Sequence, residues 1–379
     1  MKVSARRPRI GVFTKPLDNW SSGSGHHLNE ILASALDLAE GRFEFSFIHY
    51  APSANPIYAR ARELLVPRNP LAAAASLRRE GFDVLHYSPL TVYSPIWGLR
   101  ARKMATIHGV EQLLLPGLHG PLEMAHERFL VPAYARRMDA VVTVSETSAR
   151  YFVERFGVRP ERVTVCYNGV GSAYRVLEPR RDEAFLAAKG VRGPFVFHVS
   201  RFSERKNPWS LLEAFARFRS LRPENEAYAL VCAGKGWDGA EVRARAEALG
   251  LSGRFAAPGF VEEEDVVRFM NAAAAFAFPS LAEGFGMPNV EAMACGCPVV
   301  TTRSFAVGEI VGDAAIVLED PRDAEGLARG LDAAVNDPAV RGRLLAAARA
   351  RLPLFSWEEA GRKLLGIYER LADGLPGGE

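Results

Sequence analysis

Short apolar runs alternate along the whole chain with longer segments in which apolar residues recur every three or four positions. The short runs are rich in β-branched and aromatic residues, and their alternation with helical patterns predicts βα units built on parallel sheets. Strands are expected in the first half at 9–14, 43–50, 83–88, 104–108, 140–145 and 162–168, and in the second at 194–200, 228–234, 274–280, 298–302 and 314–320. The pattern therefore predicts an α/β chain with two doubly wound, Rossmann-like sheets.

A polar segment at 171–194 lies between the two halves, and it is charged and interrupted by Gly and Pro. Such a composition is typical of a linker, and 379 residues exceed what one ordinary hydrophobic core needs. We expect one domain at 1–180 and a second at 181–355. The last segment, 356–379, predicts an amphipathic helix that begins after Ser356 as its N-cap.

The composition excludes several classes of protein. With 48% hydrophobic and 24% charged residues, the chain is of the soluble globular type. Its apolar runs are too short for a signal peptide or a membrane span. The four cysteines, among them Cys295 and Cys297, fit neither a disulfide framework nor a zinc site, so we expect buried thiols and a cytoplasmic location.

The net charge of +3 is unevenly distributed, because basic residues exceed acidic ones in the first half and the reverse holds in the second. A basic half can attract an anionic partner such as a phosphorylated acceptor or an acidic membrane surface, or it can be ordinary solvated surface. The segment 121–139 predicts a helix with Arg128, Arg136 and Arg137 near an apolar face, as peripheral membrane contact would require. The alternative is a helix packed inside the first domain. Nothing in this balance indicates a nucleic-acid partner.

Candidate functional residues follow the predicted strands, where ligands of open parallel sheets bind. After the first strand, Gly23 and Gly25 open a helix whose amides can face an anion, although such a loop can also be only a turn. His108 ends the strand at 104–108 and is followed by Gly109, which lets a ligand approach.

Two cations follow the first strand of the second half. Arg201 and Lys206 can neutralise a diphosphate, Arg by a fork of donors and Lys as a point charge. Gly234 and Gly236 follow the next strand and allow another close turn.

The stretch at 280–300, "SLAEGFGMPNVEAMACGCPVV", carries the most specific pattern. Gly284 and Gly286 allow a sharp turn, and Pro288 suits the first turn of a helix, so amides can cradle a phosphate there. Glu283 and Glu291 are electrostatically misplaced beside a phosphate unless they accept hydrogen bonds from neutral hydroxyls. A pyrophosphate flanked by two sugars is a nucleotide sugar.

These residues resemble the E-x7-E region of the retaining GT-B glycosyltransferases of the family-four type. The resemblance extends over most of the chain, through "TIHG", "VTVSETSARYF", "YNGV", "VSRFSERKNP", "GFVEEEDVVRFMNAAAAFAFPSLAEGFG" and "FSW" in the family's order. It implies two Rossmann-like domains facing across a cleft, with the last helix joining the first domain. It also implies retaining sugar transfer from a UDP, GDP or ADP sugar to a glycan, lipid-linked or small-molecule acceptor, as in polysaccharide biosynthesis.

The resemblance also implies residue roles. Arg201 and Lys206 would bind the diphosphate, Glu291 the ribose and Glu283 the transferred sugar. The roles implied for the remaining residues are these: Phe285 and Gly286 complete the cradle, Phe260 and Val261 lie near the base, Gly234 forms a donor-side turn, His108 reaches the sugar or leaving phosphate, and Gly23 and Gly25 approach the phosphates and acceptor.

The chain departs from the family at two places. A single glycine, Gly308, follows Ala306 and Val307 where a double glycine is common, so Glu309 is left without a role. The loop "SSGSGHH" stands where a Gly-Gly pair followed by a basic residue is common. No Asp-x-Asp pair occurs, so we expect no tightly bound catalytic metal and no other cofactor.

Other functions remain open on this architecture. A nucleotide-sugar epimerase would need an acid/base cluster for elimination, and an α-glucan phosphorylase would need a pyridoxal-phosphate lysine and a longer chain. A nucleotide-sugar-binding protein without transfer is the non-enzymatic alternative. A Rossmann dehydrogenase fits poorly, since no Gly-x-Gly-x-x-G follows the first strand directly.

Overall fold

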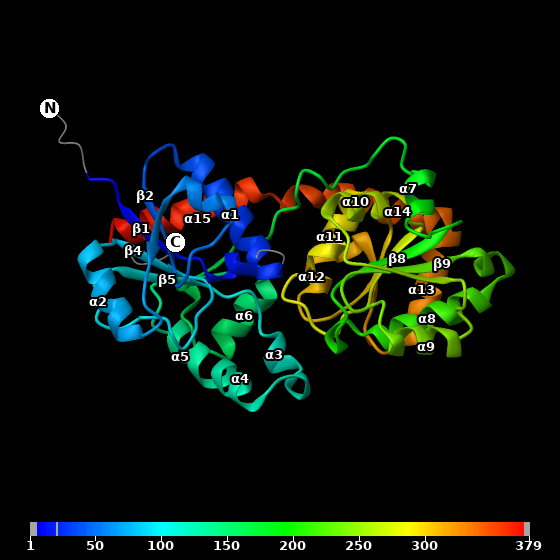
Figure 1. The fold of residues 1–379 in the computed structure, drawn as a ribbon, viewed down its shortest axis with the longest axis horizontal. Helices are drawn as coiled ribbons and strands as arrows, with labels where there is room; N and C mark the ends of the chain where they lie inside the picture. The colour runs from blue at the N-terminus through cyan, green and yellow to red at the C-terminus, as the bar shows by residue number, and fades with distance from the viewer. Residues whose placement is uncertain (1–5, 20–21, 375–379) are drawn as a thin grey trace. The chain divides into compact units, whose positions relative to one another are not determined.

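The computed structural model describes residues 6–19 and 22–374, and the chain divides into two compact units. The first unit comprises Met1–Gly169 together with Ser356–Glu379, and the second comprises Val170–Phe355. Each unit has its own parallel sheet (Figure 1). The predicted α/β class with two doubly wound sheets is therefore confirmed.

The sheet of the first unit has the strand order β3-β2-β1-β4-β5-β6-β7, and all its pairs are parallel. Its strands are β1 (Arg9–Phe13), β2 (Glu44–His49), β3 (Arg62–Leu65), β4 (Val84–Tyr87), β5 (Arg102–Thr106), β6 (Ala140–Thr143) and β7 (Val163–Val165). Its helices are α1 (Gly23–Ala39), α2 (Pro70–Glu80), α3 (Glu111–Leu114), α4 (Pro121–Ala125), a π-helical turn (His126–Leu130), α5 (Val131–Ala135), α6 (Glu146–Glu154) and α15 (Trp357–Ala372).

The sheet of the second unit has the order β10-β9-β8-β11-β12-β13, again parallel throughout. Its strands are β8 (Phe195–Val199), β9 (Ala229–Ala233), β10 (Phe255–Gly259), β11 (Ala275–Phe278), β12 (Val299–Thr302) and β13 (Ala315–Leu318). Its helices are α7 (Glu183–Ala188), α8 (Pro208–Leu221), α9 (Ala240–Ala248), α10 (Glu263–Ala272), α11 (Met287–Ala294), α12 (Val307–Val311), α13 (Ala324–Asn336) and α14 (Pro338–Arg351).

Helices cover both faces of the second sheet (Figure 1): α8, α9 and α13 lie on one side, and α10, α11 and α14 on the other. The central strands are consequently buried on both faces, which explains why they read as continuous apolar runs such as "AFAF" in β11. Phe215, Phe218 and Trp237 fill the core on the α8 side without solvent exposure.

Two strands were missed by the sequence analysis, and both lie at a sheet edge. β3 reads "RELL" and is largely exposed, so it lacks the apolar signal of a buried strand. β10 reads "FAAPG" and is only partly buried, and its Pro and Gly weaken the strand pattern. Edge strands need only one hydrogen-bonded neighbour, which tertiary pairing supplies here.

The two units meet in sequence between Gly169 and Val170, whereas we expected the boundary after residue 180. The intervening segment contacts the second unit: the Leu177 amide donates to Asn271 Oδ1 (2.8 Å), and Arg180 Nη2 donates to the carbonyls of Cys295 (3.1 Å) and Gly296 (3.0 Å). Its charged residues and its Gly and Pro interruptions are typical of a linker, but its polar groups bind atoms of the second unit.

The helix α15 packs on α1 within the first unit. Ser356 Oγ caps it by accepting from the Glu359 amide (3.2 Å), as the sequence predicted. A Cβ on Gly361 would lie 2.6 Å from Ser34 Oγ, so glycine permits the close approach of the two helices. Tyr368 is fully buried, and its hydroxyl lies 2.8 Å from His86 Nδ1.

Candidate functional site

The strand order places most of the predicted donor residues at one point of the second sheet. The order reverses between β8, which pairs with β9, and β11, which continues toward β12. Loops leaving adjacent strands in opposite directions open a crevice at the carboxyl ends of those strands. Arg201 and Lys206 follow β8, and Glu283 follows β11, so the topology brings the two motifs together.

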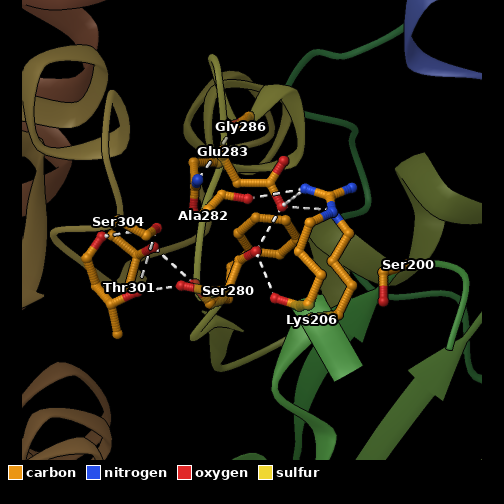
Figure 2. Close-up of polar contacts among 12 residues, drawn as sticks. Ser200, Lys206, Ser280, Ala282, Glu283, Gly286, Thr301 and Ser304 are labelled. Carbon is orange, nitrogen blue, oxygen red and sulfur yellow. Dashed lines mark hydrogen bonds and ion pairs between the residues drawn. The ribbon is translucent and has the colours of Figure 1, made fainter. Parts of the chain in front are cut away.

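Glu283 is the centre of a charged cluster at this point. Its Oε1 accepts from Ser280 Oγ (2.5 Å) and Lys206 Nζ (2.6 Å) and lies 2.8 Å from Arg205 Nη1. Figure 2 shows the side chains of Glu283, Ser280 and Lys206 converging at the ends of these strands. The Lys206 ammonium also lies 4.8 Å from the centre of the Phe278 ring. The E-x7-E acid is thus bound to the cations of the β8 loop.

The surroundings drive the pKa values of the two motif acids in opposite directions. Burial would raise the pKa of Glu283, but the charges of Lys206 and Arg205 and the hydrogen bonds from Lys206 and Ser280 lower it to about 2.

Burial raises the pKa of Glu291 to about 8, and the negative charge of Glu263 raises it further, whereas a hydrogen bond with Tyr174 lowers it. At neutral pH Glu283 is therefore charged, and most of the Glu291 population carries a proton.

The loop between the two acids turns sharply into α11. Gly286 has φ +84°, and a Cβ there would lie 2.9 Å from Asn289 Nδ2 and 3.1 Å from Val307 Cγ2. Phe285 is buried and its ring packs at 89° to that of Phe355, with 5.8 Å between centroids. The glycine turn predicted from sequence is present, and the side chain of Phe285 serves packing.

The ends of β9 and β10 provide a second group of predicted residues. Gly234 has φ +121°, and any Cβ there would clash with the carbonyl oxygen of Ser200 at the end of β8. Phe260 is 57% exposed, and Val261 beside it is buried. The Lys235 ammonium lies 5.7 Å from the centre of the Phe260 ring. An exposed aromatic ring next to a cation suits a planar, polar group such as a nucleobase.

Sequence reasoning missed Arg205 and Lys235, although both carry a recognisable signal. Arg205 precedes Lys206 in "SERKN", and Lys235 stands between two glycines after a strand. Each is a charged residue in a loop at a strand's carboxyl end. Arg201, which was predicted, follows β8 and is exposed.

The predicted residues of the first unit lie around β5 and the start of α1. His108 follows β5, and its ring stands 4.6 Å from that of His27 at 86°. His27 Nδ1 lies 2.7 Å from Asn168 Oδ1. Burial lowers the pKa of His108 to about 4, with a further contribution from His86, so its imidazole is neutral at physiological pH.

Gly23 and Gly25 form the first turn of α1, and the Gly25 amide donates to Ser22 Oγ (3.1 Å). Ser21, which belongs to the same predicted loop, lies outside the described residues. The described part of this loop therefore contains an N-capped helix start, as the Gly-x-Gly pattern suggested.

Two global features bear on the candidate partners. Among residues 6–19 and 22–374, no helix is long and apolar enough to cross a membrane. The same described residues hold no cluster of three or more His, Cys, Asp or Glu side chains arranged to bind a metal ion.

Two family profiles match the chain and together cover most of it. Residues 180–351 match the profile described as glycosyl transferases group 1, and residues 30–174 match that of glycosyltransferase family 4. The first match contains all the donor-side residues named above, and the second contains His108.

Curated proteins of known activity also match. The O-antigen chain mannosyltransferase B of Escherichia coli is 27% identical over 326 residues, which are 83% of this chain and 81% of that protein. The serotype-specific mannosyltransferase WbdA of E. coli is 28% identical over 62% of this chain, but the match spans only 29% of WbdA.

Solved structures share the fold at low sequence identity. Sucrose-phosphate synthase from Thermosynechococcus elongatus superposes with a TM-score of 0.77 at 19% identity, over 97% of this chain and 100% of that one. Anabaena HepE, determined in complex with UDP and glucose, gives a TM-score of 0.74 at 21% identity, over 95% of this chain and 99% of that one.

Proposed function

Because the chain belongs to the GT-B glycosyltransferases of the family-four type, we propose that it transfers a sugar from a nucleoside-diphosphate sugar to a hydroxyl acceptor, with retention at the anomeric carbon. Glycosyl transfer is the activity of the family. The observation that carries the proposal is the cluster of Lys206, Arg205 and Glu283 at the reversal point of the second sheet.

The donor diphosphate would lie beside the cations of the β8 loop. Arg201 is exposed there and offers a fork of donors, and Lys206 adds a point charge. The main chain at Phe285 and Gly286 leads into the N-terminus of α11, where the helix dipole favours an anion. These groups together would stabilise the negative charge that develops on the departing phosphate.

Each of the two sugars of the donor would bind one of the two acids. Glu283 uses Oε1 for Ser280, Lys206 and Arg205, and Oε2 is the oxygen we assign to hydroxyls of the transferred sugar. Glu291 would accept from the ribose. Phe260, Val261 and Gly234 would then lie at the base end of the donor.

In the first unit, we assign His108 to the transfer step, as a neutral imidazole near the sugar or the leaving phosphate. Gly23 and Gly25 are assigned to the phosphate and acceptor side, where the start of α1 offers main-chain amides.

The proposed chemistry needs no carboxylate nucleophile. Retaining hydrolases use one about 5 Å from a second acid. Here the leaving phosphate itself would take the proton of the acceptor hydroxyl as the new glycosidic bond forms, and the reaction would be metal-independent. Transfer measured with and without EDTA tests the last point, and loss of activity with EDTA that Mg²⁺ restores would contradict it.

Mannose is the first sugar to test, because curated relatives of this chain are mannosyltransferases. The acceptor would be a glycan, a lipid-linked saccharide or a small molecule. Leu122 (87% exposed) and Phe129 (67% exposed), beside Arg128, offer apolar and basic groups for peripheral contact with an anionic membrane. Tyr134 in α5 is buried, so the end of this segment packs inside the first unit.

The test begins with thermal unfolding of the full chain in the presence of UDP, GDP, ADP and their sugar conjugates, since a ligand of the folded state raises its apparent stability. Stabilisation by one base over the others identifies the donor. Transfer to an acceptor panel, with the anomeric configuration of the product read by NMR, tests retention. Absence of stabilisation by any nucleotide would contradict the donor site, and nucleotide-sugar binding without transfer to any acceptor would favour a binding protein.

A further inference from the structure

Arg205 belongs to the charged cluster of the site, but the proposed function assigns it no contact with the donor. It lies in the 3₁₀ turn Glu204–Lys206, on the loop after β8. Its Nη1 donates to the Ala282 carbonyl (2.9 Å) and lies 2.8 Å from Glu283 Oε1. Its carbonyl accepts from the Leu281 amide (2.8 Å). Arg205 is thus attached to the β11 loop by its main chain and its side chain, independently of Lys206.

Lys206 contacts the same oxygen of Glu283, and the proposed function also assigns it to the donor diphosphate. Its Nζ donates to Glu283 Oε1 (2.6 Å) and lies over the Phe278 ring (4.8 Å). In the proposed function this ammonium binds the donor diphosphate. An ammonium has three donors, so it can reach both acceptors, but its single positive charge is then shared between Glu283 and the diphosphate.

Loss of the positive charge beside Glu283 would destabilise the folded protein. Only 7% of the residue is exposed, and a buried carboxylate that loses its partner is strongly destabilised. The hydroxyl of Ser280 alone supplies a hydrogen bond and no compensating charge. A second cation beside Glu283 removes this cost when the charge of Lys206 is shared with the donor.

We propose that Arg205 is a positioning residue: it remains the counterion of Glu283, so that Lys206 is available to the diphosphate of the donor. This inference rests on the proposed function, because it assumes that Lys206 binds the diphosphate. Arg205 itself does not contact the donor. Its effect on donor binding therefore depends on the negative charge of Glu283.

A double-mutant cycle on the full-length protein tests this dependence. Dissociation constants for GDP, UDP and ADP are measured by calorimetry for the wild type, Arg205→Gln, Glu283→Gln and the double variant. Arg205→Gln should weaken binding at least about tenfold, because Lys206 is then held by the uncompensated carboxylate. In the Glu283→Gln background, the same change should alter the dissociation constant less than about twofold.

Other outcomes overturn the inference. An equal loss in both backgrounds would mean that Arg205 contacts the diphosphate directly, and no loss in either would mean that Glu283 does not compete for Lys206. If Arg205→Gln alone fails to fold, Glu283→Gln and the double variant are compared, because neither holds the buried carboxylate. A loss of nucleotide affinity in the double variant relative to Glu283→Gln would overturn the inference, since Arg205 would then act on the donor without Glu283.

Two controls complete the experiment. Arg245→Gln removes an arginine from an exposed ion pair with Glu213 (3.0 Å) in the same unit and should leave nucleotide affinity unchanged. A wild-type protein that binds none of GDP, UDP and ADP would overturn the proposed donor site itself. If the wild type binds a nucleotide and Arg205→Gln binds it with the same dissociation constant, only the role of Arg205 is overturned.

Discussion

Glu283 and Glu291 stand eight positions apart in one motif, yet their surroundings give them different charges. Glu283 meets two cations and a hydroxyl, whereas Glu291 meets Tyr174 and lies near the negative charge of Glu263. The charge state of a glutamate in this motif therefore follows from its neighbours in space. Substitution of either acid tests this difference.

Glu283→Ala should reduce sugar transfer by about 100-fold or more, because the hydroxyl contacts we assign to it gain strength in the transition state. The dissociation constant for the bare nucleoside diphosphate should change far less. The free energy of unfolding should fall by about 3 kcal/mol, since Lys206 and Arg205 lose their shared acceptor.

Chemical denaturation, calorimetry and a transfer assay measure these effects. Glu319→Ala, which removes an exposed acid paired with Arg303, is the matched control and should cost less than about 1 kcal/mol. Equal losses in transfer and in nucleotide binding would show that Glu283 does not touch the sugar.

Glu291 should make stability fall with rising pH. Because its pKa is raised to about 8 in the folded protein from an ordinary value of 4.5, its proton is held more tightly in the folded state. Its contribution is fully present below pH 4.5 and is lost as the pH rises to about 8. Denaturation of the wild type and Glu291→Gln between these values should show a steeper decline for the wild type.

Glu263→Gln provides the second variant of this experiment. Removal of the neighbouring charge should lower the pKa of Glu291, so that the decline ends at a lower pH. If the free energy of unfolding depends on pH identically in all three proteins, the pKa of Glu291 is not raised in the folded state.

At the scale of elements, glycines decide whether the loops at the carboxyl ends of the strands can form. Gly234→Ala should lower the free energy of unfolding by about 3 kcal/mol or more, because the residue has φ +121° and its Cβ would meet the Ser200 carbonyl. Nucleotide binding should weaken along with it. Denaturation and calorimetry check both effects.

Gly342→Ala is the matched change in a helix. Gly342 is exposed within α14, and a Cβ added there would meet open space, so alanine should stabilise the protein by about 0.5–1 kcal/mol. A destabilisation of similar size at both positions would contradict the argument from backbone conformation.

At the scale of the whole molecule, the chain crosses from the first unit to the second and returns for its last helix. A protein truncated after Phe355 loses α15, whose buried side chains Leu364, Leu365 and Tyr368 cover the first unit. We expect amides of β1, β2 and α1 to lose protection from hydrogen exchange.

The second unit is the internal control of this truncation, since it has its own sheet and core. Protection in β8, β9 and β11 should persist. Uniform loss of protection in both units would show that they unfold as one cooperative body.

The sequence by itself determined the α/β class, the two sheets, eleven of the strand positions and the turn at Gly286, because buried strands and glycine turns leave periodic and compositional signals. The edge strands β3 and β10 carry little of this signal and form through pairing with their neighbours. The boundary at Gly169 likewise depends on contacts of Leu177 and Arg180 with distant residues of the second unit.

Only the tertiary structure decided which charges meet. Lys206 and Glu283 are 77 positions apart, and their contact arises because β8 and β11 are adjacent in a sheet whose order differs from the chain order. Arg205 has the same signal as Lys206 in its own segment, but its contacts with Ala282 and Glu283 became visible only when the sheet order placed the β11 loop beside it. Local sequence specifies where the chain turns and which residues are buried, whereas electrostatic partners across the sheet depend on strand order.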